Sequence, residues 1–172
     1  MLLRAATEDD VSTLVELGRQ SFTDSFGHLY AAEDLAAFLD EYRSAERFAA
    51  SVASPDTHLA VAEEKDALLG YCTTYFGARF DQRPEPQPDR PCMLGQLYCA
   101  QSAIGRGVGT ALLENAISEA RSRGCDAMQL SVYSENFGAQ RLYQRRGFVK
   151  IADIDFWVGN HRDDEFLYEL RL

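Results

Sequence analysis

A glycine-rich stretch in the second half of the chain constrains its fold more than any other feature. It reads Ile104-Gly-Arg-Gly-Val-Gly-Thr110, with glycines at alternate positions between a mostly apolar run and an amphipathic helical run. Glycine has no Cβ and readily adopts positive φ, so such a backbone can approach a ligand closely. The helix that follows begins with unpaired N–H groups and the positive end of its dipole, which together suit a pyrophosphate. The stretch therefore predicts a strand–turn–helix unit that binds phosphate, with a tight turn that holds no ligand as the alternative.

Two well-known phosphate-binding motifs do not match this stretch. A Walker A loop ends in Gly-Lys-Ser/Thr, and the lysine is missing before Thr110. The dinucleotide fingerprint has the spacing G-x-G-x-x-G near the start of a βαβ unit, whereas this chain has G-x-G-x-G late in its sequence.

The hydrophobic pattern alternates between helical and strand-like periods. Helices are expected over about 7–21, 32–42, 44–53, 110–123 and 137–146. Strands are expected over about 2–5, 58–63, 68–76, 93–99, 127–133, 148–157 and 165–172. The proline-rich segment 80–91 is expected to be a loop, and the polar segment 159–164 a turn. We therefore expect an α/β fold, with a mixed, mostly antiparallel sheet and helices on both faces, in one domain over residues 1–172.

Charge and composition exclude several classes of function. The net charge is −10, so the basic surface typical of nucleic-acid-binding proteins is missing. An acidic balance could favour cationic substrates, although plain solubility is the simpler explanation. No apolar run is long enough to span a membrane, and the N-terminus turns acidic too early for a signal peptide, so we expect a cytoplasmic location without membrane contact. The spacings of the 4 cysteines and 3 histidines match no zinc site, so no metal is expected.

A second motif follows the glycine stretch. Asn136, Ala139 and Tyr143 have the spacing i, i+3, i+7, which places them on one stripe of a helix that ends near Gly147-Phe148. Taken singly, Asn136 is most simply an N-cap and Tyr143 a buried aromatic residue. The combination of this stripe with a phosphate-binding turn is more specific than either part.

Together with Leu97-Tyr98-Cys99, the two motifs resemble the GNAT superfamily of N-acetyltransferases. The resemblance implies splayed central strands with acetyl-CoA held between them as co-substrate, strand backbone against the pantetheine and glycine-stretch amides on the pyrophosphate. Tyr143 would face the sulfur as catalytic acid. The cofactor-binding residues that it implies are Leu97, Tyr98, Cys99, Ile104, Gly105, Arg106, Gly107, Val108, Gly109, Thr110, Asn136 and Tyr143.

This chain departs from the family pattern at two places. Ile104 stands where the usual loop begins with Arg or Gln, so we expect weaker cofactor binding, which Arg106 could partly offset. Many relatives carry a glutamate on the strand before the loop, but Leu94-Gly-Gln-Leu97 has no carboxylate. Glu135, Tyr98 and a chain of water molecules are the remaining candidates for the general base.

The ends of the chain are similar to PaiA-type spermidine/spermine acetyltransferases. The matching pieces are Ser21–Phe26, Glu33-Asp34-Leu35 and Asp155–Gly159. This resemblance implies a polyamine as the small-molecule amine substrate. A peptide or protein N-terminus, or an amino acid, is the alternative acceptor, and a non-catalytic acyl-CoA-binding sensor is the alternative from another class. Homodimers are common among such folds, but the sequence indicates no interface.

Overall fold

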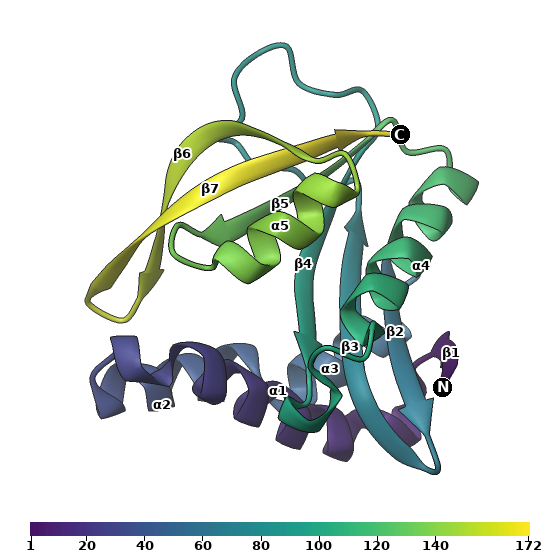
Figure 1. The fold of residues 1–172 in the computed structure, drawn as a ribbon, viewed down its shortest axis with the longest axis vertical. Coiled ribbons are helices and arrows are strands. Elements are labelled where there is room, and N and C mark those ends of the chain that lie inside the picture. The colour runs from purple at the N-terminus through teal and green to yellow at the C-terminus, as the bar shows by residue number, and fades with distance from the viewer.

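Seven strands form one mixed sheet in the computed structural model, which describes residues 1–172. The strands are β1 (Leu2–Ala5), β2 (Thr57–Glu64), β3 (Ala67–Phe76), β4 (Pro91–Cys99), β5 (Ala127–Tyr133), β6 (Val149–Val158) and β7 (His161–Arg171). Their order across the sheet is β1-β2-β3-β4-β5-β7-β6 (Figure 1). Every neighbouring pair is antiparallel except β4 and β5, which run parallel. The predicted mixed, mostly antiparallel sheet is thereby confirmed.

Helices cover both faces of this sheet, as predicted. They are α1 (Val11–Phe26), α2 (Ala32–Tyr42), α3 (Ala45–Ala53), α4 (Val108–Ser122) and α5 (Phe137–Arg145), with short 3-10 helices η1 (Glu8–Asp10), η2 (Gly27–Leu29) and η3 (Gln101–Ala103). On β2, Leu59 packs with Leu14 of α1 and Phe48 of α3. The next residue, Ala60, packs in the core cluster that contains Leu112 of α4. Because successive side chains of a strand point to opposite faces, α1 and α3 cover one face and α4 the other.

The segment 159–164 is not the turn that its polarity predicts. β7 already begins at His161, so the β6–β7 turn consists only of Gly159 and Asn160. In Figure 1 the tip of this hairpin points toward α2. Gly159 has a φ of +56°, and a Cβ there would clash with a carboxylate oxygen of Asp34 on α2, so only glycine fits. The prediction was wrong because Asp163 is a polar residue that faces the interior of the protein, and its polarity made this part of the strand resemble a loop.

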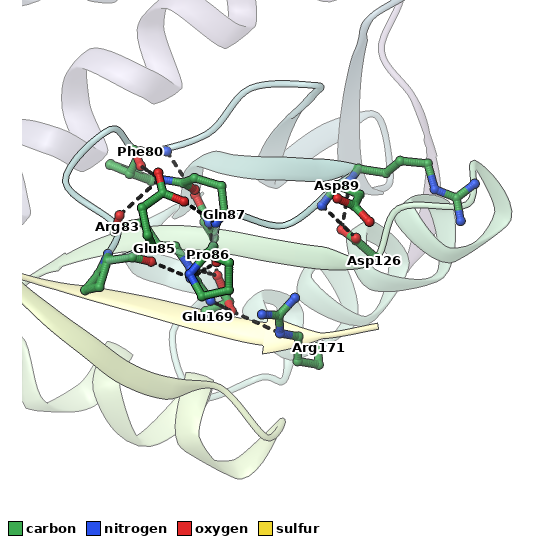
Figure 2. A network of polar contacts seen from close by, with 12 residues as sticks. Phe80, Arg83, Glu85, Pro86, Gln87, Asp89, Asp126, Glu169 and Arg171 are labelled. Atoms are coloured by element: carbon green, nitrogen blue, oxygen red, sulfur yellow. Dashed lines mark hydrogen bonds and ion pairs between the residues drawn. The ribbon is translucent and has the colours of Figure 1, made fainter.

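The proline-rich segment before β4 is irregular, as predicted, but it is firmly attached to the sheet (Figure 2). Arg83 Nε and Nη2 donate to the two carboxylate oxygens of Glu169 on β7 at 2.8 and 2.9 Å. Gln129 on β5 donates to Glu169 at 3.0 Å and accepts from the Phe80 amide at 2.9 Å. Arg83, Gln129 and Glu169 therefore satisfy one another's buried polar groups.

No helix of the structure combines the length and the apolar character that crossing a bilayer requires.

Candidate active site

The sheet opens in its middle, where β4 and β5 diverge. The two strands pair only from Pro91 to Met93 on β4. Just beyond, the register between β3 and β4 shifts at Gly95, which is an extra residue in β4. A bulge of this kind bends its strand and increases the local twist, so β4 turns away from β5. The central strands are splayed, as the sequence led us to expect.

A cavity of about 860 Å³ occupies this opening. Its walls come from β4 and β5, the glycine stretch, α5, the α1–α2 region and the β6–β7 hairpin. Pockets for small-molecule ligands have volumes of about 300–1,000 Å³, so this cavity is large enough for an extended ligand.

The glycine stretch forms one rim of the cavity. Gly105 and Gly107 have φ values of +78° and +81°, and a Cβ built at either would meet nothing within 4 Å. Gly107 is the N-cap of α4, and the first amide bonded to a carbonyl of this helix is that of Ala111. The amides of Val108 to Thr110 therefore lack intrahelical acceptors beside an open surface, which fits a phosphate group.

Helix α5 supplies the opposite wall. Asn136 caps the helix, with its Oδ1 accepting from the Ala139 amide at 3.1 Å, and it also lines the cavity. Tyr143 is only 7% exposed, and its ring packs against Phe148. Burial raises the pKa of Tyr143, so its hydroxyl keeps its proton at neutral pH. Inside this cavity it is a hydrogen-bond donor.

Two carboxylates of β7 face the far end of the cavity. Asp163 is 4% exposed, accepts a 2.5 Å hydrogen bond from the Tyr30 hydroxyl, and lies 3.2 Å from His161 Nε2. Glu165 lies two residues further along the strand and lines the same cavity. Burial raises the pKa of Glu165 to about 6; the neighbouring Asp163 adds to this rise, and the Ser131 side chain opposes it.

A buried arginine lies at the same end. Arg43 is 5% exposed, and its guanidinium lies 5.3 Å from the ring centroids of both Phe22 and Tyr98 and 5.5 Å from that of Phe38. Its Nη1 donates to the Tyr42 carbonyl, but its Nε is buried without a partner. No carboxylate forms an ion pair with this cation, although buried charges in proteins are usually paired.

The model of the acetyltransferase (GNAT) family matches residues 17–148, which include the splay, the glycine stretch and α5. The chain belongs to this family. It is accordingly an acetyl-CoA-dependent N-acetyltransferase of the GNAT type.

Relatives and solved structures agree with the family assignment. The chain is 24% identical over 166 residues to an uncharacterized N-acetyltransferase in the pepI 3′ region of Lactobacillus delbrueckii subsp. lactis. The alignment covers 96% of this chain and 94% of that protein. The crystal structure of PaiA N-acetyltransferase from Thermoplasma acidophilum in complex with coenzyme A has a TM-score of 0.82 at 20% identity, with 99% and 98% of the two chains covered. The ribosomal-protein-S18-alanine N-acetyltransferase from Escherichia coli has a TM-score of 0.71 at 17% identity, with 99% and 92% covered. At these identities the structural likeness concerns the fold.

Most of the cofactor-binding residues that the sequence indicated for a GNAT enzyme line the cavity. These are Leu97, Tyr98, Cys99, Ile104, Gly105, Gly107, Val108, Gly109, Thr110, Asn136 and Tyr143. Arg106 does not line it; its Nη2 pairs with Glu64 Oε2 at 2.8 Å at the end of β2. Ile104 is 63% exposed at the rim. Arg106 is thus already engaged elsewhere and gives no sign of replacing the side chain that GNAT proteins usually carry at the position of Ile104.

The candidates for the general base lie in different places. Glu135 is exposed and does not line the cavity. Tyr98 lines it, and burial raises the pKa of its hydroxyl, which disfavours the charged form. Sequence reasoning missed Arg43, Asp163 and Glu165. The sequence does contain a signal for the two acids. Asp163 and Glu165 occupy the same alternate positions of β7 as Leu167 and Glu169, so they are expected on the same, inward face of the strand.

Proposed function

We propose that this GNAT enzyme transfers the acetyl group of acetyl-CoA to a primary amine of a small polycation such as spermidine or spermine. The observation that carries the proposal is a pair of carboxylates, the buried Asp163 and the half-buried Glu165, at the end of the cavity away from the glycine stretch. Carboxylates in a poorly solvated cavity attract ammonium groups strongly, because water screens them little. The net charge of −10 and the resemblance to PaiA-type enzymes point the same way.

The residues that would hold acetyl-CoA are the ones on the glycine rim and α5. The free amides of Val108, Gly109 and Thr110 suit the pyrophosphate, and the unpaired edge of β4 beyond Met93 suits the pantetheine amides. The acetyl thioester supplies a carbonyl carbon that an amine can attack and a sulfur that can leave.

The amine must lose a proton before it can attack. An alkyl amine has a pKa of about 10.4, so holding it neutral at pH 7 costs on the order of 4.6 kcal/mol. A base within the cavity reduces this cost when it accepts that proton. Glu165, Tyr98 or an ordered water molecule can occupy this position, whereas Glu135 would have to act from outside the cavity.

Tyr143 would stabilise the departing sulfur. In water, a proton transfer from tyrosine to a thiolate is unfavourable by about 2 kcal/mol, since their pKa values are about 10 and 8.5. Burial raises the pKa of the Cys99 thiol, which lines the cavity, to about 11, and it raises the pKa of Tyr143 as well. A bare thiolate is therefore disfavoured there, and a hydrogen bond from Tyr143 stabilises the departing sulfur, although burial alone does not make full proton transfer favourable. The same raised pKa makes Cys99 a poor nucleophile, which favours direct attack by the amine.

Arg43 favours a second candidate acceptor. A buried cation without a carboxylate partner, at the wall of a ligand cavity, is suited to an anionic group on the ligand. An amino acid, or a peptide short enough to bring its carboxylate to Arg43, would present both this anion and an amine.

Release of free thiol from acetyl-CoA, measured over a panel of amines, tests the proposal. Spermidine and spermine should be turned over with the highest kcat/KM, above diaminopropane, free amino acids and dipeptides. Higher turnover of a free amino acid or dipeptide would transfer the assignment to the second candidate. An inert panel with a protein that binds CoA by calorimetry would contradict small-amine acetylation altogether.

A further inference from the structure

One carboxylate oxygen in the cavity has no partner within the protein. Glu165 Oε2 is buried and accepts no hydrogen bond. No lysine or arginine forms an ion pair with this side chain, although it lines the cavity. Buried polar atoms are almost always hydrogen-bonded, so an exception at the wall of a ligand site indicates an atom that receives its partner from the ligand.

We infer that Glu165 is the general base of the acetyl transfer and takes a proton from the ammonium group of the acceptor. This inference rests on the proposed function, and it adds a residue that neither the glycine stretch nor the α5 motif contains.

The surroundings of Glu165 are mainly hydroxyl groups and one acid, and the cation Arg43, which contacts Tyr98 at the same end of the cavity, forms no ion pair with Glu165. Asp163 precedes it on the same strand face, and Tyr133 is its partner across the β5–β7 pairing, whereas Ile154 is its partner on β6. The other groups close enough to interact with its charge are Ser131 on β5, Tyr30 after η2, Tyr98 on β4 and Tyr143 on α5. These hydroxyls can orient the carboxylate, and none can neutralise it by ion pairing.

Asp163 is less suited to the same role. One of its oxygens accepts from Tyr30 at 2.5 Å, and the other lies 3.2 Å from His161 Nε2. With both oxygens engaged, Asp163 is a fixed charge that attracts the acceptor and raises the basicity of its neighbour. Glu165, with a free oxygen, is the carboxylate that can accept a proton.

The pKa of Glu165 supports this division. Burial, together with Asp163, raises it to about 6, so the side chain is mostly ionised at pH 7 yet more basic than an ordinary glutamate. A base whose pKa lies just below the working pH combines a high ionised fraction with a favourable proton transfer.

The proton balance of the reaction is then complete. Glu165 takes one proton of the ammonium group and releases it to solvent. The nitrogen forms a bond to the carbonyl carbon, the carbon–sulfur bond breaks, and Tyr143 donates a proton to the sulfur. Tyr143 regains a proton from the newly acylated nitrogen, which keeps the third one as an amide N–H.

The pH dependence of kcat/KM in matched variants tests the inference, with the best acceptor of the amine panel. The wild-type activity should fall below about pH 6 as Glu165 becomes protonated. Glu165→Gln should lose about 100-fold or more at pH 7.5 and should lack the inflection near pH 6. Glu165→Asp should retain the inflection with intermediate activity. Asp164→Asn is the control, because Asp164 lies next to Glu165 with its side chain 70% exposed.

A second readout does not depend on turnover. The carboxyl carbon of Glu165, followed by ¹³C NMR in the free protein and assigned by its loss in Glu165→Gln, should titrate near pH 6. Titration below pH 4.5, or a Glu165→Gln variant with full activity and an unchanged inflection, would overturn the inference. Loss of activity in Glu135→Gln with Glu165→Gln unaffected would assign the base to Glu135 instead.

The two proposals fail in different ways. A wild-type protein that binds CoA but acetylates no amine removes the proposed function. A wild-type protein that turns over, with a Glu165→Gln variant equally active and CoA binding equal in both, removes only the role of Glu165.

Discussion

Glu165 and Glu169 lie on the same face of β7, but at opposite ends of the β4–β5 junction, and their surroundings shift their pKa values in opposite directions. We call the end where β4 pairs with β5 the closed end, and the end where the two strands diverge the open end. Glu169 lies at the closed end, opposite Gln129, and accepts hydrogen bonds from both Arg83 and Gln129. Burial alone would raise the pKa of Glu169, but these hydrogen bonds outweigh it and the pKa is lowered. Glu165 lies at the open end, opposite Tyr133, and burial raises its pKa to about 6.

The difference shows how one strand serves both structure and chemistry. At the closed end the loop before β4 returns over the sheet and brings Arg83 to Glu169, so the buried carboxylate has partners within the protein (Figure 2). At the open end β4 bends away at Gly95, and Glu165 and Arg43 keep unpartnered polar atoms at the wall of the cavity. The closed end is built for stability, and the open end keeps hydrogen-bonding capacity for ligands.

The largest effect should be a loss of stability when the buried ion pair between Arg83 and Glu169 at the closed end is broken. Arg83→Met removes the bidentate partner of a buried carboxylate, since the side chains of Arg83 and Glu169 are 10% and 5% exposed. Leaving one partner of a buried ion pair alone typically costs about 3–5 kcal/mol. We expect the free energy of unfolding in urea to fall by about 3 kcal/mol.

Arg171→Met is the matched control for this prediction. Arg171 also contacts Glu169, at 3.2 Å, but its side chain is 59% exposed. An exposed ion pair contributes about 0.2–1 kcal/mol, so this variant should lose less than about 1 kcal/mol. Equal losses in the two variants would mean that the closed end does not depend on the buried pair.

The next effect concerns the open end and should leave stability nearly intact. In Tyr143→Phe the ring still packs against Phe148, while the only hydroxyl of α5 at the cavity wall is lost. General acids contribute about 10²–10⁴-fold, so kcat should fall by roughly 100-fold with little change in the Kd for CoA. Steady-state kinetics and calorimetry separate these quantities. Tyr168→Phe is the control, because Tyr168 is also buried but does not line the cavity. Wild-type turnover in Tyr143→Phe would remove Tyr143 from the mechanism.

A smaller effect concerns the pH dependence of the unfolding free energy, to which Glu165 at the open end and Glu169 at the closed end should contribute with opposite signs. The pKa of Glu165 is raised from 4.5 to about 6 on folding, so its contribution favours the folded state below pH 4.5 and declines as the pH rises through 6. This rise in the pKa corresponds to about 2 kcal/mol of stability. The unfolding free energy of Glu165→Gln, relative to wild type, should therefore increase by about 2 kcal/mol between pH 4 and pH 7.

Glu169→Gln should show the reverse trend. The pKa of Glu169 is lowered on folding, so its stabilising contribution is present above its unfolded pKa and is lost as the pH falls. The deficit of Glu169→Gln relative to wild type should be largest at pH 7 and should narrow toward pH 4. Urea unfolding at both pH values gives the comparison, and parallel trends in the two variants would contradict the contrast between the two ends.

The sequence predicted the elements of this fold well because their signals are local. The hydrophobic period of 32–42 and the alternation of 127–133 match α2 and β5. The contacts of the closed end could not be predicted, because Arg83 and Glu169 are separated by 86 residues in the sequence. The polarity of Gln129 suggests that it lies on the solvent-facing side of its strand, whereas it is fully buried. Nothing near Gln129 in sequence reveals that the Phe80 amide and Glu169 will bury it.

The candidate site divides in the same manner. The glycine stretch and the Asn136–Tyr143 stripe were recognisable because their geometry is set within one turn and one helix. The far end of the cavity was missed because it combines Arg43, which follows α2, with Asp163 and Glu165 on β7. Polar residues that face a cavity look like loop residues in a sequence, so the sequence pattern places the start of β7 four residues too late, at Glu165 instead of His161.

The smallest effect should come from the rim of the open end, at Ile104. This side chain is 63% exposed beside the glycines, where GNAT proteins usually carry Arg or Gln. Ile104→Arg would place a cation near the amides that suit the pyrophosphate, in surroundings where water and salt screen it, so a gain of about 0.2–1 kcal/mol is reasonable. We expect CoA to bind roughly threefold more tightly by calorimetry, with the gain declining as ionic strength rises. Ile104→Leu, which changes shape without adding charge, should bind as the wild type does. A gain that persists at high salt would mean that the introduced guanidinium acts through buried contacts, and an unchanged Kd would mean that the main-chain amides alone determine phosphate affinity at this rim.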